Sequence, residues 1–373
     1  MEASPLKVAV LMGGPGSERE ISVQSGGAVL KALSEAGIDH VAWDVQPDAL
    51  QFLEDPSITL FFIALHGEFG EDGQLQRILE KRGLLYTGSG PDASELAFDK
   101  LASKRVFERQ GVPCPRAIEF TEGLDATGLQ IQLQPFEDKI VVKPPRGGSS
   151  LGVQIVARDV DLWNLCRRTL ADYGSCMVEQ FIAGRELTVS ILDECALPVI
   201  EVQPARPFYD YHAKYVDDGT RYLFDTLSEA ESHALQQQAL RCFEGLGLRH
   251  FGRIDFILSP EGVAYCLEAN SIPGLTSHSL LPKAAQKAGH SMSDICCSIV
   301  DAATRCLKTP SSARERAVYS PGKNGKAGDI GSIVDGGGCN QAATGPLVFD
   351  PEAQTRREAR SSSQKAPGCE PTP

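Results

Sequence analysis

Apolar and polar residues alternate in blocks over the first part of the chain. Apolar runs at 8–12 and 60–65 have the length of buried strands, and a segment with helical periodicity near 23–36 lies between them. Uniformly apolar strands that alternate with helices are typical of a parallel sheet covered on both faces. Ligands bind to such sheets at loops that follow the carboxyl ends of the strands.

The pattern changes after about residue 95. The next part predicts a helix with Lys100 and Lys104, a proline-rich break at 112–115 and a strand at 139–143. A strand-rich part follows and ends in a helix near 292–307. We therefore predict an N-terminal α/β domain, a central domain, a C-terminal domain and a disordered tail, with bounds of 1–95, 96–184, 185–308 and 309–373.

The predicted tail has few apolar clusters and many Gly and Ser residues, which is typical of a segment without a packed core. The alternative is one or two short strands at 330–334 and 347–349.

Residues 252–258 and 266–270 predict a β-hairpin with a short turn between them. Side chains alternate between the two faces of a strand, so Asp255 shares a face with Arg253, and Glu268 shares one with Asn270. Two carboxylates and an amide oxygen on adjacent strands form an all-oxygen set that suits Mg²⁺. The alternative is a hairpin whose charged face is simply solvated.

Composition and charge limit the class of protein. The chain has 373 residues, of which 42% are hydrophobic and 23% charged, and its net charge of −13 argues against nucleic-acid binding. The 11 cysteines show no metal-binding spacing, and several lie in apolar runs, so we expect buried free thiols at Cys166, Cys242, Cys296 and Cys297. We expect neither a signal peptide nor a membrane-spanning run, and predict a cytoplasmic protein without a membrane partner.

Two glycine-rich loops are candidates for ligand binding. The first, at 13–16, follows a strand and precedes a helix, but Glu18 beside it would repel a phosphate and suits an ammonium group better. The alternative for Glu18 is an acid that favours the N-terminus of the helix dipole. The second loop, at 144–152, follows Lys143 and offers backbone N–H groups to a polyphosphate, or forms a mobile surface hairpin. Glu179 and Glu186 are candidates for accepting hydrogen bonds from the adenine amino group and the ribose hydroxyls. The alternative is that both side chains face the solvent.

Taken in order, motifs between about residues 6 and 307 resemble the D-alanine–D-alanine ligases, which belong to the ATP-grasp superfamily. The resemblance rests on segments 13–20, 64–76, 86–90, 98–100, 142–150, 208–215, 252–255, 267–270 and 273–280. It implies a three-domain ATP-grasp architecture in which an N-terminal parallel-sheet domain and two α+β domains enclose ATP. It also implies ligation of two D-alanines through a D-alanyl phosphate for peptidoglycan synthesis, and a homodimer.

The resemblance implies a role for each matching residue. ATP would be held at its phosphates by Lys100 and Lys143, at its adenosine by Glu179 and Glu186, and at the transferring phosphate by Lys214. Two Mg²⁺ ions, for which Mn²⁺ can substitute, would be held by Asp255, Glu268 and Asn270.

The family roles also cover the amino-acid substrates. Glu18, with His66 nearby, would bind the ammonium group of the first D-alanine, and Ser279 with the N–H of Leu280 the carboxylate of the second. Arg253 and the N–H of Gly274 would stabilise the tetrahedral oxyanion. A hydrogen-bonded set would close a loop over the substrates, and its members are Glu18, Ser149 and Tyr215.

Departures from the family pattern occur at 145–148 and 220–227, outside the assigned residues. Two alternatives stay open. One is another ATP-grasp carboxylate–amine ligase, with D-serine or D-lactate as acceptor. The other is a nucleotide-binding regulator without turnover.

Overall fold

The computed structural model describes residues 6–148, 151–158, 161–204 and 219–308, all within one compact unit. The predicted site residues Ser149, Lys214 and Tyr215, and the predicted tail, lie outside the described residues.

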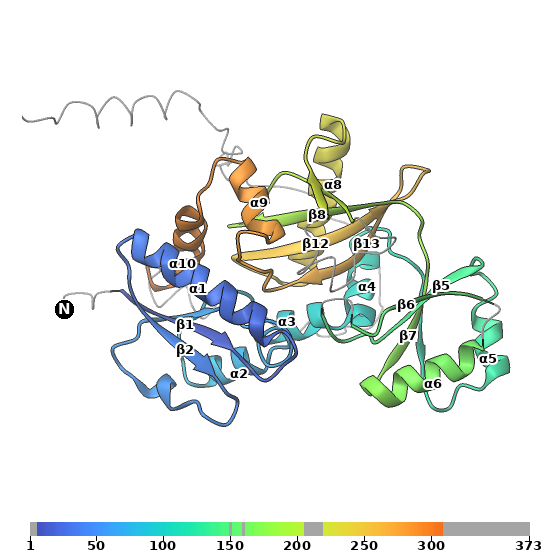
Figure 1. Ribbon diagram of the computed structural model, residues 1–373, viewed down its shortest axis with the longest axis horizontal. Coiled ribbons are helices and arrows are strands. Elements are labelled where there is room, and N and C mark those ends of the chain that lie inside the picture. The colour runs from blue at the N-terminus through green and yellow to red at the C-terminus, as the bar shows by residue number, and fades with distance from the viewer. Residues whose placement is uncertain (1–5, 149–150, 159–160, 205–218, 309–373) are drawn as a thin grey trace, which may run out of the picture. The chain divides into compact units, whose positions relative to one another are not determined.

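The N-terminal part contains the parallel sheet that the apolar runs predict (Figure 1). Its strands, in the order β2-β1-β3, are β1 (Lys7–Gly13), β2 (Asp39–Val45) and β3 (Leu60–Ile63). Helix α1 (Arg19–Glu35) begins four residues before the predicted helix, because the chain enters the helix directly from the glycine-rich turn at Glu18. The 3₁₀ helix η1 (Gln51–Glu54) and helix α2 (Gln74–Lys81) complete this part.

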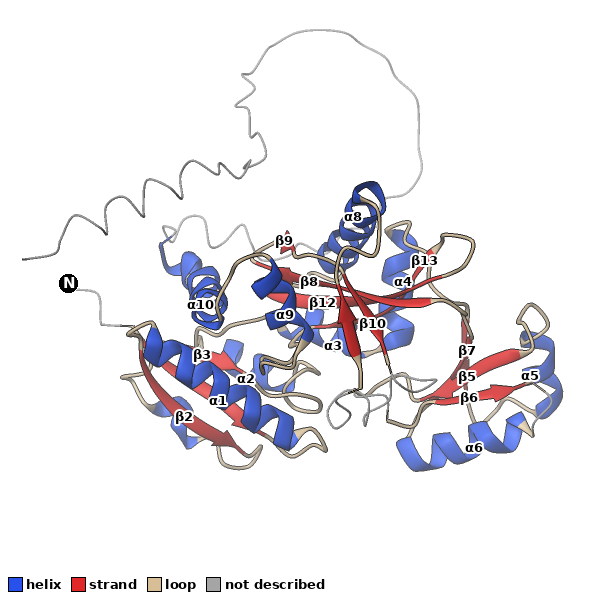
Figure 2. Ribbon diagram, turned by 45° about the horizontal axis from the view of Figure 1, so that its top comes forward, coloured by secondary structure: helices blue, strands red, loops and turns tan. Residues whose placement is uncertain are grey.

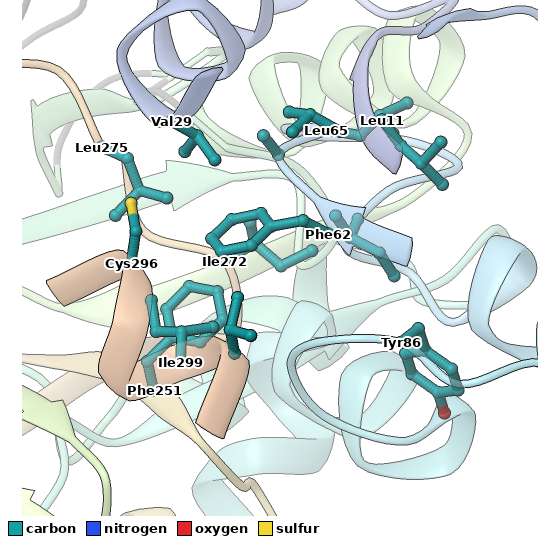
Figure 3. Packing of buried hydrophobic residues seen from close by; sticks show 14 of the residues in the cluster. Leu11, Val29, Phe62, Leu65, Tyr86, Phe251, Ile272, Leu275, Cys296 and Ile299 are labelled. Carbon is teal, nitrogen blue, oxygen red and sulfur yellow. The ribbon is translucent and has the colours of Figure 1, made fainter. Parts of the chain in front are cut away.

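The largest apolar core joins this sheet to segments from the other end of the chain. Helices α9 (Leu280–Lys287) and α10 (Met292–Lys308) contribute to it, together with the loop after the last strand. Figure 3 shows Ile272 and Leu275 of that loop in this core with Val29 and Phe62. The loop is therefore packed against the N-terminal sheet.

The next part of the chain, residues 117–180, forms a four-stranded antiparallel sheet. Its order is β4-β7-β5-β6, and β5 matches the strand predicted at 139–143. Helices α5 and α6 share its apolar core. The elements are β4 (Ala117–Phe120), α5 (Ala126–Gln132), β5 (Lys139–Lys143), β6 (Gln154–Ala157), α6 (Leu162–Tyr173) and β7 (Cys176–Gln180).

The third sheet is also antiparallel, in the order β11-β10-β8-β12-β13 with β9 paired to β8. Its strands are β8 (Arg185–Leu192), β9 (Cys195–Ala196), β10 (Ile200–Gln203), β11 (Arg221–Leu223), β12 (Phe251–Leu258) and β13 (Ala264–Asn270). The helices in its core are α3 (Pro91–Phe98), α4 (Lys100–Arg109) and α8 (Glu229–Gly245).

The predicted hairpin is confirmed as β12 and β13. Asp255 pairs directly with Glu268, and Arg253 pairs with Asn270. A β-bulge after Asp255 shifts the register, so the pairing beyond it no longer follows the simple alternation.

The described cysteines are free thiols, as predicted. Cys166, Cys242 and Cys296 are buried as predicted, whereas the predicted burial is wrong for Cys297, which is half-buried, and Cys195 is exposed. Within the described ranges, no helix combines the length and apolar character needed to cross a membrane.

Candidate active site

A cavity of about 600 Å³ is lined by residues of both antiparallel sheets, which lie next to each other in Figure 2. This volume suits a ligand the size of a nucleotide. The cavity is lined by most of the residues that the sequence predicts for nucleotide and metal binding, namely Lys100, Lys143, Glu179, Glu186, Asp255 and Glu268.

Two buried lysines and one buried carboxylate form a tight cluster at the wall of this cavity. Lys104 Nζ and Lys143 Nζ each lie 2.6 Å from an oxygen of Glu179. Burial alone would raise the pKa of Glu179, but the attraction of the lysines outweighs it and holds the pKa below its ordinary value. Burial lowers the pKa of Lys143, and Glu179 opposes that shift. Glu179 is therefore an ionised partner of two lysines, and the solvent-facing alternative is wrong for it.

Lys100 connects the second glycine-rich loop to the hairpin. It begins helix α4, whose N-terminus is capped by the Asp99 side chain. Its Nζ donates to the carbonyl of Gly147 at 2.7 Å and lies 3.1 Å from Glu268 Oε2. Arg146 also pairs with Asp99, at 3.1 Å. The loop is thus held at the N-terminus of α4, close to the predicted metal ligand Glu268.

Asp255 is hydrogen-bonded at both of its carboxylate oxygens. Arg253 donates to both of its oxygens at 2.8 Å, the Thr188 hydroxyl to Oδ1 at 2.6 Å and Asn270 Nδ2 to Oδ2 at 3.0 Å. Since the carboxylate only accepts, the amide nitrogen of Asn270 faces it, and the amide oxygen remains available as a ligand.

The hairpin residues fit a magnesium site by their chemistry. Asp255, Glu268 and Asn270 supply oxygen donors from adjacent strands, and Mg²⁺ typically takes one or two carboxylates and completes its shell with phosphate oxygens and water. No group of three or more His, Cys, Asp or Glu side chains with metal-binding geometry occurs in the part of the chain that the structure describes. That finding is consistent with this set, because its third member is an amide.

A smaller pocket of about 80 Å³ adjoins the cavity. The two share part of their walls, namely Gly148, Arg253, Glu268 and Leu280. The smaller pocket is further lined by Glu18, His66, Glu71, Asn270, Gly274 and Ser279. All the predicted amino-acid-binding residues within the described ranges therefore meet in one place.

Glu18 is 7% exposed and lies between two glycines. A Cβ built on Gly67 or Gly148 would approach Glu18 Oε2 to 2.7 or 2.6 Å, closer than real Cβ contacts. Gly67 also has a φ of +72°, which favours glycine. The close fit brings the carboxylate of the first glycine-rich region to the second one, although the two are far apart in sequence.

Ser279 and Leu280 lie at the N-terminus of α9. Ser279 directly precedes the helix, and its Oγ accepts from the Thr276 N–H at 3.1 Å. Leu280 is the first helical residue, a position whose N–H has no partner within the helix. An anion is favoured at such a helix end.

Sequence reasoning missed three residues that support the site. Thr188 contacts Asp255, Lys104 pairs with Glu179, and Ser25 contacts His66. Thr188 could have been found from the sequence, because it lies two residues after Glu186 on β8 and residues two apart share one face of a strand. Nothing local marked the other two, because their partners come from distant segments.

This arrangement defines the class of protein as an ATP-grasp ligase: two antiparallel sheets enclose a cavity with lysines and an all-oxygen hairpin, beside a small polar pocket. Residues 108–301 match the family described as D-ala D-ala ligase C-terminus. The chain is 40% identical over 300 residues to the D-alanine–D-alanine ligase of Methylacidiphilum infernorum, which covers 80% of this chain and 96% of the relative. It is 43% identical over 290 residues to that of Marinobacter nauticus, which covers 78% and 88%.

Solved structures agree with these relatives. The D-alanine–D-alanine ligase of Bacillus anthracis in complex with ATP matches with a TM-score of 0.71 and 29% identity, over 81% of this chain and 99% of that one. D-alanyl-alanine synthetase A of Vibrio cholerae matches with a TM-score of 0.71 and 27% identity, over 82% and 100%. The chain belongs to the D-alanine–D-alanine ligase family.

Proposed function

We propose that the protein joins two D-alanines to D-alanyl-D-alanine, with ATP as the energy source and D-alanyl phosphate as the intermediate. The observation that carries the proposal is the shared wall of the two pockets at Gly148, Arg253 and Glu268. ATP in the larger cavity and an amino acid in the smaller pocket would meet at that wall. The product would serve peptidoglycan synthesis, in the cytoplasm where ATP is supplied.

In the first step, the carboxylate of the first D-alanine attacks the γ-phosphorus of ATP, and ADP leaves. Glu18 would hold the ammonium group of this substrate, which turns its carboxylate towards the shared wall. Lys100 and Lys143 would hold the phosphates, and Glu179 and Glu186 the adenosine. Positioning and charge neutralisation provide most of the rate in phosphoryl transfer.

Asp255, Glu268 and Asn270 would hold Mg²⁺. When bound, Mg²⁺ or Mn²⁺ would neutralise negative charge on the phosphates. Arg253 and Thr188 keep Asp255 oriented towards this role by their hydrogen bonds.

In the second step, the amine of the second D-alanine attacks the carbonyl of D-alanyl phosphate, and phosphate leaves. Ser279 Oγ and the N–H of Leu280 would hold the acceptor's carboxylate. Arg253 and the N–H of Gly274 would stabilise the oxyanion, which is where preorganised donors lower the barrier most.

Three further roles belong to residues outside the described ranges. We propose that Lys214 contacts the transferring phosphate, and that Ser149 and Tyr215 join Glu18 in closing a loop. We also propose a homodimer, and the domain bounds 1–95, 96–184 and 185–308 with a tail from 309.

The test is an assay with ATP, Mg²⁺ and a panel of D-amino and D-hydroxy acids, in which ADP and ligated products are both measured. We expect D-alanyl-D-alanine as the main product, with one ADP formed for each dipeptide. Products with D-serine or D-lactate in the second position would indicate the related acceptor specificity. ATP binding without any product would favour a regulator instead.

A further inference from the structure

Two hydrogen bonds bracket Gly274 on the loop between β13 and α9. On one side, the carbonyl of Ile272 lies 3.0 Å from His66 Nδ1. On the other side, the N–H of Leu275 donates to Ser25 Oγ at 3.2 Å. Both partners come from the N-terminal part of the chain, where Ser25 is fully buried and His66 is 6% exposed.

The two bonds are the ends of one continuous chain of hydrogen bonds. A carbonyl only accepts, so His66 Nδ1 carries the proton that it donates to Ile272. In the neutral ring Nε2 is then an acceptor, and the Ser25 hydroxyl lies 2.8 Å from it. Ser25 Oγ thus donates to His66 and accepts from Leu275. Each polar hydrogen of the chain has an acceptor.

Apolar packing around the loop cannot replace these bonds. Ile272 and Leu275 are buried in the large core (Figure 3), which fixes the depth of the loop. Hydrophobic contact is non-directional, however, and does not set the rotation of the peptide planes. Gly274 has no side chain of its own, and a Cβ there would lie 2.6 Å from Ser279 Oγ. The two hydrogen bonds hold the peptide planes on either side of the one that carries the Gly274 N–H, and so limit the directions in which this N–H can point.

We propose that Ser25 and His66 are positioning residues that aim the Gly274 N–H at the oxyanion of the second step. The inference rests on the proposed function, in which Gly274 is the oxyanion donor. Both ring nitrogens of His66 are used in the chain of hydrogen bonds, so His66 acts on the loop rather than directly on the first D-alanine. The Glu71 carboxylate is a neighbour of the same ring, and its Oε1 lies 3.8 Å from His66 Nδ1.

The proposal predicts a specific defect for Ser25→Ala. Formation of D-alanyl phosphate needs no oxyanion donor at Gly274, so ATP is still consumed. Amide formation slows, and water cleaves more of the acyl phosphate to D-alanine and inorganic phosphate. We expect dipeptide turnover to fall about five- to tenfold, as for loss of one or two hydrogen bonds, with an unchanged KM for ATP. The ratio of ADP to dipeptide should rise clearly above one.

Ser22→Ala is the matched control. Ser22 lies one turn earlier on α1, is also fully buried, accepts from the Gly13 N–H at 2.9 Å and donates to the Ala64 carbonyl at 2.8 Å. It has the same burial and the same number of hydrogen bonds as Ser25, but none to the loop of Gly274. We expect a comparable loss of stability and an ADP-to-dipeptide ratio that stays near one.

A second pair of variants covers the case in which Ser25→Ala does not fold. His66→Asn can keep a hydrogen-bond donor near the position of Nδ1, whereas His66→Ala keeps none. The ratio of ADP to dipeptide should therefore rise more for His66→Ala. Wild-type ratios in all folded Ser25 and His66 variants would overturn the inference. So would a raised KM for D-alanine with a ratio of one in the His66 variants, since that result would indicate direct substrate contact. If the wild type makes no dipeptide, the proposed function itself fails, which is a distinguishable result.

Discussion

Three acidic side chains of the site are buried, and each has different surroundings. Glu179 is paired with two lysines, Asp255 is hydrogen-bonded by Arg253, Thr188 and Asn270, and Glu18 lies against two glycines. The surroundings of Glu179 supply two positive charges, and those of Asp255 supply hydrogen-bond donors to both of its oxygens. They also allow the roles to be tested by changes that remove charge but keep shape.

Glu18→Gln tests the proposed ammonium anchor. A charge-assisted hydrogen bond contributes roughly 1.5–3 kcal/mol, so we expect the KM for the first D-alanine to rise about ten- to a hundredfold. The KM for ATP should change little. Steady-state kinetics with each substrate varied will measure both, and equal losses for the two substrates would mean that Glu18 supports the structure instead.

Glu179→Gln tests the buried charge cluster. The change leaves Lys104 and Lys143 without their counter-charge in a buried place, and removal of one partner from a buried ion pair costs roughly 3–5 kcal/mol. We expect the free energy of unfolding in urea to fall by about that amount. Glu186→Gln is the control, because Glu186 lines the same cavity but is half-buried, and it should cost far less.

At the scale of elements, the hairpin of β12 and β13 brings the predicted metal ligands together. Strand alternation places their side chains, and cross-strand pairing sets Asp255 opposite Glu268. Helix α4 adds Lys100, which contacts Glu268 and the loop at Gly147. One hairpin and one helix N-terminus therefore hold both the ligands and the glycine-rich loop beside them.

Glu268→Gln tests the hairpin as a metal site. The change removes charge but little volume, so the fold should persist while turnover at saturating Mg²⁺ falls about a hundredfold or more. Glu261→Gln makes the same chemical change in the exposed turn of the same hairpin and should leave turnover unchanged. Circular dichroism checks the fold of both variants. Normal turnover of Glu268→Gln would contradict the metal assignment.

At the scale of the whole molecule, His250 connects the N-terminal part to the start of β12. Its Nδ1 accepts from the Gly88 N–H at 3.0 Å, which requires the neutral ring. Burial lowers the pKa of His250 to about 4 from 6.5, with Arg249 and Arg305 adding to the shift and Asp193 opposing it. Between pH 6.5 and about 4 the unfolded chain therefore binds a proton that the folded chain does not.

This difference predicts an acid-sensitive component of stability. It is fully present above pH 6.5 and is lost as the pH falls to about 4, and in total it amounts to about 3 kcal/mol. His250→Asn should remove this component, and Asn tolerates the positive φ of 67° at this position. Urea unfolding at pH 7 and pH 4.5 will measure the difference, with the less buried His233→Asn as control. An unchanged pH dependence in His250→Asn would contradict the argument.

Removal of residues 309–373 tests the predicted tail. About four fifths of this chain match the two solved relatives, and that part covers 99–100% of the length of each relative. We therefore expect truncation after Lys308 to leave turnover and melting temperature nearly unchanged. A melting temperature lower by several degrees would show that the tail supports the ligase.

The sequence alone determined the class of fold and most of the residues of the candidate site. Apolar runs, the hairpin and the order of motifs are local features, because the alternation of side chains along a strand follows from backbone geometry. The grouping of Asp255, Glu268 and Asn270 on one hairpin therefore follows from the order of residues along the chain. Only the tertiary structure decided which side chains are partners across the molecule. Glu179 between Lys104 and Lys143, Glu18 against Gly148, and Ser25 with His66 beside Gly274 depend on packing between segments far apart in sequence, and no local pattern encodes such packing.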